Sequence, residues 1–354
     1  MSGSDVTKGG LEGVQPGRDA TIGVNAEANR TGRRRRRGGE QAMVPDAQFT
    51  SYYGKPIINK PVWEAPDIPG YLFLGGLAGA SSVMAALADA TGKDNLARAS
   101  KVGAGGAISV GLLGLVHDLG RPARFLNMLR TFKPTSPMSV GSWFLAAYGP
   151  AAAVSAGSAV TGILPRIGAL ATGGAAAVGP LVAAYTAALI SDTAVPAWHD
   201  GFREMPFVFV GSGASAAGGL GMLAAPAGEA GPARRVAALG AALELAASKR
   251  MEHRLGEIAE PYHEGRSGRL MRAAEVLTVA GAGGGLLLGG RSRKAATICG
   301  AALVAASALT RFGIFEAGMA SAQNPEHTVK PQRERLRREG PAYSPAVERP
   351  RGAR

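Results

Sequence analysis

The sequence predicts an all-α integral membrane protein with eight transmembrane helices. Of its 354 residues, 46% are apolar and only 18% are charged. Each of four stretches without Asp, Glu, Lys or Arg has at least about 20 residues, the length that a helix needs to cross a hydrocarbon core of about 30 Å. These stretches are Ile68–Ala88, Pro134–Pro165, Ile167–Ser191 and Met205–Gly228. Surface helices of soluble proteins keep a polar face, so this pattern predicts a membrane environment.

Eight apolar segments account for the helix count. Small residues recur in them, as in "LFLGGLAGASS" and "GSGASAAGGLGML", and small residues let helices approach closely in a membrane. Glu244 interrupts the sixth segment. The segments are 69–89, 99–117, 142–164, 167–191, 205–226, 233–249, 271–290 and 294–318. An even number of spans places both ends of the chain on one side of the membrane.

Basic polar segments flank the predicted membrane domain of residues 67–322. Residues 1–66 form a tail that we expect to be disordered. It closes with "FTSYYGKPIINKPVW" at 49–63, whose aromatic and Lys residues are typical of the headgroup interface. Residues 323–354 form a second basic tail, also expected to be disordered. Lys and Arg beside membrane spans indicate the cytoplasmic side, so we expect a multi-pass protein of the cell membrane with both termini in the cytoplasm.

The positive charge does not predict a nucleic-acid partner. The net charge is +13, and the run Arg33–Arg37 lies in a Gly-rich leader that offers no aromatic platform. Proteins that bind single-stranded nucleic acid combine such charge with aromatic side chains on which bases stack. We therefore expect contact with anionic headgroups of the lipid membrane and no nucleic acid.

Few residues are available as metal or cofactor ligands. Cys299 is the only cysteine, whereas an iron–sulfur cluster needs several thiolates. The five histidines, His117, His199, His253, His263 and His327, lie at span ends, in loops or in a tail. A haem held by two histidines needs them to face each other between helices. The sequence therefore predicts no metal site and no bound cofactor.

Titratable side chains gather at the span ends that share a side with the tails. Tyr71 opens the first span, His117 and Asp118 follow the second, and Tyr185 and Asp192 lie near the end of the fourth. Ionisable groups at membrane depth are costly and are candidates for function, although each can also be an ordinary loop charge. A phenol, an imidazole and a carboxylate beside apolar helices suit quinone chemistry, which needs a hydrogen bond to a carbonyl and a proton relay.

Several sequence blocks resemble a known family. "HDLGRPARFLNML" from His117 and "SPMSVGSWFLAAYG" at 136–149 resemble the His-Leu-Gly-Arg-Pro and Ser-Trp signatures of the NrfD/polysulfide reductase membrane-subunit family. The stretch 185–219 resembles its Tyr-Thr-Gly segment leading to Pro-x-Trp, and 311–328 resembles its closing segment. Two residues depart from the family pattern. Asp118 is inserted after His117, where the family reads His-Leu-Gly, and Ala187 stands where the family commonly has Gly.

The resemblance implies eight helices in two four-helix bundles that form the membrane anchor of a respiratory oxidoreductase complex. Such an anchor exchanges electrons between menaquinone or menaquinol, its substrate, and an iron–sulfur subunit that serves a molybdopterin-type catalytic subunit. By this resemblance Tyr185 is the pocket tyrosine, His117 and Asp118 border the pocket, and Tyr71 falls in the same region. With the titratable residues named above, we expect Tyr71, His117, Arg121 and Tyr185 to contact the quinone and Asp118 and Asp192 to relay protons. Because the chain lacks a redox centre, it does not catalyse this reaction alone.

Two other readings remain open. The chain could be a secondary transporter or a proton-translocating module that uses Glu244, Glu275, Arg311 and Glu316, although we find no convincing internal repeat of the kind that many transporters have. It could also be a structural anchor with no quinone site.

Overall fold

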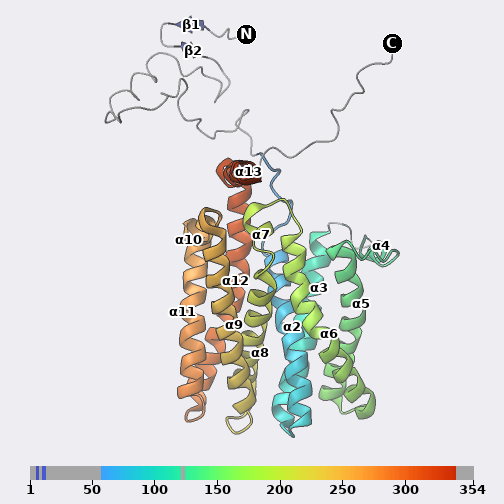
Figure 1. Cartoon of the computed structure of the whole chain (residues 1–354). Coiled ribbons are helices and arrows are strands. Elements are labelled where there is room, and N and C mark those ends of the chain that lie inside the picture. Colours follow the sequence, from blue (N-terminus) through green and yellow to red (C-terminus); the bar gives the residue numbers. More distant parts are fainter. Residues whose placement is uncertain (1–4, 8–9, 13–56, 120, 122–123, 340–354) are drawn as a thin grey trace. The chain divides into compact units, whose positions relative to one another are not determined.

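The computed structural model describes residues 5–7, 10–12, 57–119, 121 and 124–339. The chain divides into two units, one of residues 61–321 and one of residues 1–60 with 322–354. The larger unit is all-helical, as predicted, and carries the candidate site. Successive long helices in it run antiparallel (Figure 1). Its long helices are α2 (Asp67–Ala90), α3 (Asp94–Asp118), α5 (Pro137–Thr161), α6 (Pro165–Ser191), α8 (Met205–Ala224), α9 (Gly231–Leu255), α11 (Gly265–Leu287) and α12 (Arg293–Gln323).

Short elements close one end of this helical unit. They are α4 (Arg124–Met128), α7 (Pro196–His199), the 3-10 helix η1 (Gly256–Ala259) and α10 (Glu260–His263). We call this end, where α2 begins and α3 ends, the α7 end (Figure 1). The opposite end holds the turns that join α2 to α3, α5 to α6, α8 to α9 and α11 to α12.

Seven helices in the described part of the chain are long and apolar enough to cross a membrane. They correspond to seven of the eight predicted segments, and the chain is a multi-pass helical membrane protein. The exception is α9, which contains Arg234, Arg235, Glu244, Lys249 and Arg250. These charges lower its mean hydropathy, although the helix is 25 residues long.

Local sequence explains where the helices begin and end. Proline occupies the first turn of α5, α6, α8 and α9, where its fixed φ suits a helix and no hydrogen bond is lost. The Ser136 side chain caps α5 at the Ser139 amide. At the other end of α5, Gly162 adopts a φ of 71°, a conformation that glycine reaches at little cost.

Glycines bring the central helices into backbone contact. Helix α2 packs against α3, α6 and α8, and α8 packs against α9. A Cβ atom on Gly79 of α2 would lie 2.2 Å from the carbonyl oxygen of Gly179 of α6. A Cβ atom on Gly211 of α8 would lie 2.6 Å from the Glu244 amide nitrogen of α9. Close packing of this kind replaces the hydrophobic effect that membrane helices lack.

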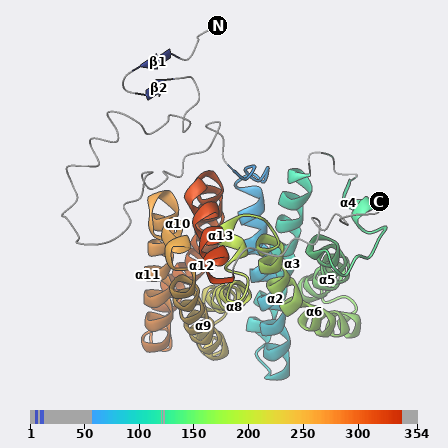
Figure 2. The ribbon, with the colours of Figure 1, turned by 45° about the horizontal axis from the view of Figure 1, so that its top comes forward.

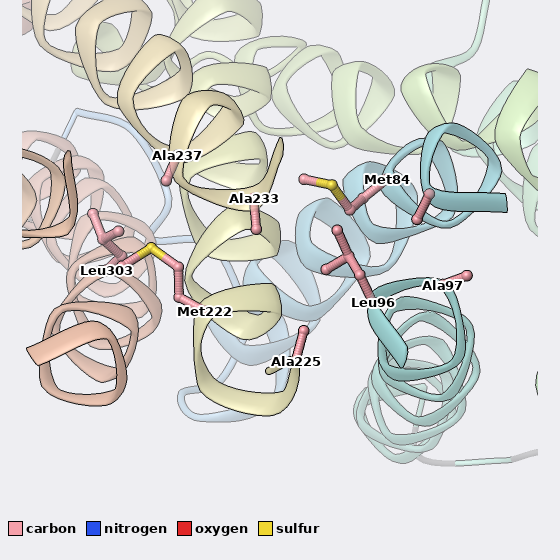
Figure 3. Packing of buried hydrophobic residues seen from close by; sticks show 9 residues of the cluster. Met84, Leu96, Ala97, Met222, Ala225, Ala233, Ala237 and Leu303 are labelled. Carbon is pink, nitrogen blue, oxygen red and sulfur yellow. The ribbon is translucent and has the colours of Figure 1, made fainter. Parts of the chain in front are cut away.

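A cluster of buried apolar residues fills the space between helices toward the opposite end (Figure 3). Met84 and Leu96 come from α2 and α3, and Met222 and Leu303 come from α8 and α12. The remaining members are Ala88, Ala97, Ala225, Ala233 and Ala237. We call this set the apolar cluster; it contains no charged or polar side chain.

The second unit contains regular structure where the sequence predicts disordered tails. Strands β1 (Asp5–Thr7) and β2 (Gly10–Glu12) pair antiparallel within residues 1–66. Helix α13 (Pro325–Glu339) lies within residues 323–354. Ion pairs between residues one helical turn apart support a polar helix, and Lys330 lies 2.9 Å from Glu326.

Candidate functional site

Two tyrosines meet at the α7 end of helices α2 and α6. Tyr71 lies one turn into α2, and Tyr185 lies two turns before the end of α6. Both side chains are buried, and their hydroxyl groups hydrogen-bond to each other. Because helices rise about 1.5 Å per residue, the pair lies roughly 6–9 Å below the helix ends. The structure thus joins two residues that the sequence predicted to contact a quinone.

The ring of Tyr185 is held by helix α5. A Cβ atom on Gly141 would lie 1.9 Å from Cε2 of Tyr185, so only glycine leaves room for the ring. Phe144, one turn further along α5, meets Tyr185 edge-on with ring centroids 6.3 Å apart. Aromatic pairs favour this geometry. Helix α5 therefore fixes the position of the phenol from a third direction.

A second polar pair lies one turn above Tyr71. Nδ1 of His117, at the end of α3, lies 2.6 Å from Oδ2 of Asp67, the first residue of α2. The His117 side chain is 81% exposed, whereas that of Asp67 is 20% exposed. Asp67 and Tyr71 are four residues apart and so share one face of α2. The exposed imidazole and the buried phenols are therefore successive layers of one region.

The other predicted site residues lie around this region without joining it. Asp118 accepts a hydrogen bond from the Glu64 amide at 3.3 Å, and so contacts the segment that leads into α2. Arg121 and Asp192 are exposed. Among the described residues, no hydrogen bond or ion pair links either of them to the tyrosine pair.

Exposed aromatic residues surround the same end of α5. Phe132 and Trp143 are both exposed and meet edge-on with ring centroids 6.2 Å apart. Trp143 is two residues from Gly141, which contacts Tyr185. Tryptophan is enriched where the hydrocarbon core meets the headgroups. The tyrosine pair therefore lies near the depth at which these aromatic residues mark a membrane interface.

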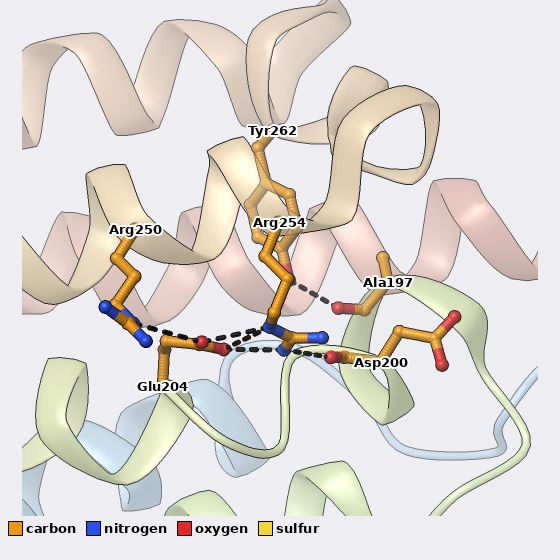
Figure 4. A network of polar contacts seen from close by, with 6 residues as sticks. All are labelled: Ala197, Asp200, Glu204, Arg250, Arg254 and Tyr262. Carbon is orange, nitrogen blue, oxygen red and sulfur yellow. Dashed lines mark hydrogen bonds and ion pairs between the residues drawn. The ribbon is translucent and has the colours of Figure 1, made fainter.

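The segment between α6 and α8 is anchored at the α7 end by charge (Figure 4). The Arg254 guanidinium of α9 donates to both carboxylate oxygens of Glu204 and to the Asp200 carbonyl. Arg250 lies 3.8 Å from the same carboxylate. Hydrogen bonds from Arg254 hold the pKa of Glu204 below its usual range. This network joins the start of α8 to the end of α9.

Aromatic side chains anchor α7 itself. Trp198 is fully buried and donates from Nε1 to the Ile314 carbonyl of α12 at 2.7 Å. The Tyr262 hydroxyl of α10 donates to the Ala197 carbonyl at 2.8 Å, and burial raises the pKa of Tyr262. Trp198 belongs to the Pro-x-Trp signature, so a residue of this signature fixes α7 against α12.

Sequence reasoning missed two residues of the site. Asp67 was not a candidate because it precedes the first apolar segment, yet it holds His117. Gly141 was not a candidate because the sequence is rich in glycine, with 52 residues of this type. Only its position directly before Ser142 and Trp143, within the Ser-Trp signature, distinguishes it in the sequence.

The four residues of the transporter reading fall into two groups: Glu244 and Arg311 are close enough to interact electrostatically, whereas Glu275 and Glu316 lie in separate ion pairs. Glu244 and Arg311 are buried. Glu275 is partly exposed and lies 3.1 Å from Lys249, and Glu316 lies 3.5 Å from Arg266. Within the described residues, no three side chains of His, Cys, Asp or Glu are grouped as metal ligands would be.

Comparison with known proteins bears on the same helices. A family model described as polysulphide reductase, NrfD matches residues 57–229, which include α2, α3, α5, α6 and α8 and therefore the tyrosine pair. The resembling block at 311–328 lies outside the matched residues. No curated protein matches the chain. Residues 57–229 of the chain are therefore similar to the NrfD polysulphide reductase family.

Proposed function

We propose that this protein is the quinone-reactive membrane anchor of a respiratory oxidoreductase complex. In this function it exchanges electrons between menaquinone or menaquinol and a partner iron–sulfur subunit. The observation that carries the proposal is the buried contact between Tyr71 and Tyr185 at the α7 end. Similarity to the NrfD family makes a quinone the expected substrate.

The tyrosine pair has the chemistry to bind a quinone carbonyl. A phenol has one O–H donor and also accepts, so when one hydroxyl donates to the other, the second keeps its own hydrogen. That hydrogen is available to a carbonyl oxygen. Since both phenols are uncharged, the interaction does not require a buried charge, which membrane helices tolerate poorly. Gly141 and Phe144 hold one of the phenols in place.

The layer above the tyrosines supplies a route for protons. Quinol oxidation releases protons together with electrons, so a titratable group must connect the ring to water. His117 is exposed and lies 2.6 Å from Asp67, one turn above Tyr71. In our proposal, His117 and Asp67 pass protons between bulk water and the quinone. Asp118, Asp192 and Arg121 tune the charge around this route.

The membrane topology that goes with this function has eight spans in two four-helix bundles. Helix α9 is the eighth span: its 25 residues cover about 37 Å at 1.5 Å per residue, and its Leu239 is 72% exposed, as a lipid-facing residue is. The two bundles are α2, α3, α5, α6 and α8, α9, α11, α12, which lie on different sides of the α2–α8 contact (Figure 2). Residues 67–322 form the membrane domain, and the basic tails place both termini in the cytoplasm.

Electrons must leave the chain through partners. With one cysteine and no other redox centre in the sequence, the protein has no carrier of its own. The iron–sulfur subunit docks at the α7 end, where the distance to a quinone bound at the tyrosine pair is shortest. A molybdopterin-type catalytic subunit completes the complex.

Conservative variants in the assembled complex test this proposal. Tyr185→Phe and Tyr71→Phe each remove one hydroxyl, and we expect quinone-dependent turnover to fall by about tenfold or more, the loss of one hydrogen bond of about 1.4 kcal/mol. Tyr148→Phe is the matched control, because Tyr148 is also buried and its hydroxyl contacts Ser82 at 2.8 Å, away from the tyrosine pair.

Two readouts separate a site defect from a structural one. Electron transfer from an artificial donor to the catalytic subunit, which bypasses the quinone, should stay at the wild-type level in all three variants. Wild-type quinone turnover in Tyr185→Phe and Tyr71→Phe would refute the site. Equal losses in Tyr148→Phe would show that any buried hydroxyl matters and would also count against it.

A further inference from the structure

A second polar region lies deep between α9, α11 and α12. A cavity runs from Glu252, Tyr262 and His263 at the α7 end to Glu244 and Thr310 near mid-depth. Its volume, measured as the space open to the centre of a water molecule, is about 40 Å³. One water needs roughly 10–15 Å³ by this measure. The cavity is therefore large enough for a short chain of water molecules.

Two buried ionisable groups lie at or beside the inner end of this cavity: Glu244 lines it, and Arg311 follows the lining residue Thr310 on α12. Glu244 is 4% exposed and Arg311 is 0% exposed. Oε1 of Glu244 accepts from the Thr310 hydroxyl at 2.8 Å. One Arg311 nitrogen donates to the Phe209 carbonyl at 2.7 Å, and its guanidinium lies 3.8 Å from the centre of the Phe209 ring.

Several polar atoms of these two groups have no protein partner. They are Oε2 of Glu244 and Nε and Nη1 of Arg311. An unsatisfied polar atom in a protein interior costs about 1–3 kcal/mol, and more when it is charged. Buried charges persist only when their remaining hydrogen-bonding atoms are satisfied. Since Glu244 lines the cavity, water is the partner that its free oxygen can reach.

The cavity leads to one end of the membrane domain only. From Glu244 toward the opposite end, α9 continues through Ala237 and Ala233, which belong to the apolar cluster (Figure 3). Ala237 is about 10 Å below Glu244 at 1.5 Å per residue. Met222 and Leu303 fill the space beside these alanines. The polar path therefore ends at the Glu244–Arg311 level.

We propose that Glu244 is a proton-binding site that exchanges protons with water at the α7 end through this cavity. The free carboxylate oxygen accepts a proton from a hydronium ion, which remains as water, and returns it by the same path; no electron moves. Arg311 supplies the compensating positive charge when Glu244 is ionised. The site does not depend on quinone binding and lies outside the residues matched by the NrfD family model.

Other charged groups face the path from each helix that lines it. Lys249 lies between Glu252 of its own helix and Glu275 of α11, at 3.4 and 3.1 Å. His263 lies 3.9 Å from Glu252, and Arg272 lines the same cavity. Ser212 of α8 and Ser307 of α12 hydrogen-bond to each other at 2.9 Å. Cations and carboxylates thus alternate along the cavity, and Glu244 is the only buried carboxylate among its described lining residues.

Infrared spectroscopy of the full-length purified protein in lipid nanodiscs tests the site directly. We expect a carboxylic-acid C=O band that grows as the buffer is acidified and shifts when H₂O is replaced by D₂O. The band should be missing in Glu244→Gln, which keeps the side-chain shape. It should persist in Glu275→Gln, which changes a partly exposed carboxylate at the mouth. Identical spectra for wild type and Glu244→Gln overturn the proposal.

A second pair of variants tests the route. Ser248 lines the cavity one turn above Glu244 on α9, so Ser248→Leu fills the path, and exchange then needs local opening of the helices. We expect the deuterium shift of the Glu244 band to slow by about tenfold or more. Ala246→Leu adds the same side chain at an exposed position of α9 and should leave the rate unchanged.

Thr278→Val keeps the test decisive if Ser248→Leu does not fold. It removes one hydroxyl from the wall of the cavity at nearly constant volume, and it should slow exchange in the same direction. A wild-type exchange rate in the folded variants shows that protons do not follow this path and overturns the proposal. Because no quinone or partner is present, this result is independent of the quinone site.

Discussion

The two helix groups of the membrane domain handle buried polar side chains in different ways. Between α2 and α6, Tyr71 and Tyr185 are uncharged and satisfy each other. Between α9 and α12, Glu244 and Arg311 are ionisable and leave three side-chain atoms without a protein partner. The first arrangement is complete without solvent, whereas the second requires water.

This difference separates two kinds of chemistry. Neutral hydroxyls can donate a hydrogen bond to a quinone carbonyl oxygen without placing a charge in a medium of low dielectric constant. A carboxylate beside a guanidinium can gain and lose a proton while the pair remains partly compensated. The first group is suited to hold a quinone, and the second is suited to store a proton.

The largest expected effect is on the charged pair. Arg311 interacts electrostatically with Glu244 without a direct ion pair, so Arg311→Met leaves an ionised Glu244 uncompensated. The expected cost is at most about 3–5 kcal/mol, the range for breaking a direct buried pair. Thermal unfolding in detergent should show this loss. Glu244→Gln should cost less, because Arg311 keeps the Phe209 carbonyl and ring as partners.

The double variant is the control for this prediction. Arg311→Met combined with Glu244→Gln removes both charges and should recover more than half of the loss seen in Arg311→Met. A cost below about 1 kcal/mol for Arg311→Met alone would show that the pair is solvated like a surface pair, and the contrast between the helix groups would disappear.

A glycine in the tyrosine group gives the next largest effect. Gly141→Ala places a methyl group where the Tyr185 ring lies, and overpacking of this kind costs about 1–3 kcal/mol. Binding of a quinone analogue, measured by calorimetry in detergent, should weaken together with stability. Gly149→Ala is the matched control on α5, since its Cβ would meet Leu112 at an ordinary 3.7 Å. Equal behaviour of the two variants would contradict the proposed role of Gly141.

The ion pair at the end of the second group should respond to pH. Hydrogen bonds from Arg254 lower the pKa of Glu204 in the folded protein. The ion pair therefore stabilises the fold fully at pH values above the unfolded pKa of about 4.3. This stabilisation is lost as the pH falls through the folded pKa. We expect Glu204→Gln to lower the free energy of unfolding by about 1–2 kcal/mol near neutral pH. This is a little less than the loss of a fully buried charged hydrogen bond, because Arg254 is partly exposed. The cost should shrink below about pH 4. A cost that is the same at both pH values would contradict this assignment.

Composition and charge spacing predicted most of the fold. Uninterrupted apolar stretches of about 20 residues are enough to locate helices such as α2 and α6, because a helix satisfies its backbone hydrogen bonds within one segment. Helix α9 shows the limit of this rule, since its charges lower the mean hydropathy while packing against α8 keeps it beside the apolar helices. Its Arg234 and Lys249 lie toward the helix ends, where long side chains reach the interface.

The candidate site was predictable only in part. Residue type and depth were enough to select Tyr71, Tyr185 and His117. The partners Asp67 and Gly141 were not predictable, because what matters in each is a contact between segments 50 and 44 residues apart in the sequence. The hydrogen bond between Glu244 and Thr310 depends on how α9 faces α12, which apolar periodicity does not encode in a chain so rich in Ala and Gly.

The smallest structural effect is expected at His117, and it gives the sharpest test of the comparison. Its imidazole is 81% exposed, and exposed ion pairs contribute little to stability, so His117→Ala should leave the melting temperature unchanged. If His117 relays protons for the quinone, turnover in the assembled complex should still fall by about 10²-fold, the lower limit for loss of a general acid–base group. His199→Ala is the matched control, because His199 is also exposed at the α7 end but its imidazole contacts the Ser191 carbonyl and Phe202 rather than a carboxylate beside the tyrosine pair. The Glu244 infrared band should remain in both variants, since neither histidine lines the cavity between α9, α11 and α12. A loss of that band in His117→Ala would mean that the two helix groups share one proton path, and their division into a quinone site and a separate proton site would then be wrong.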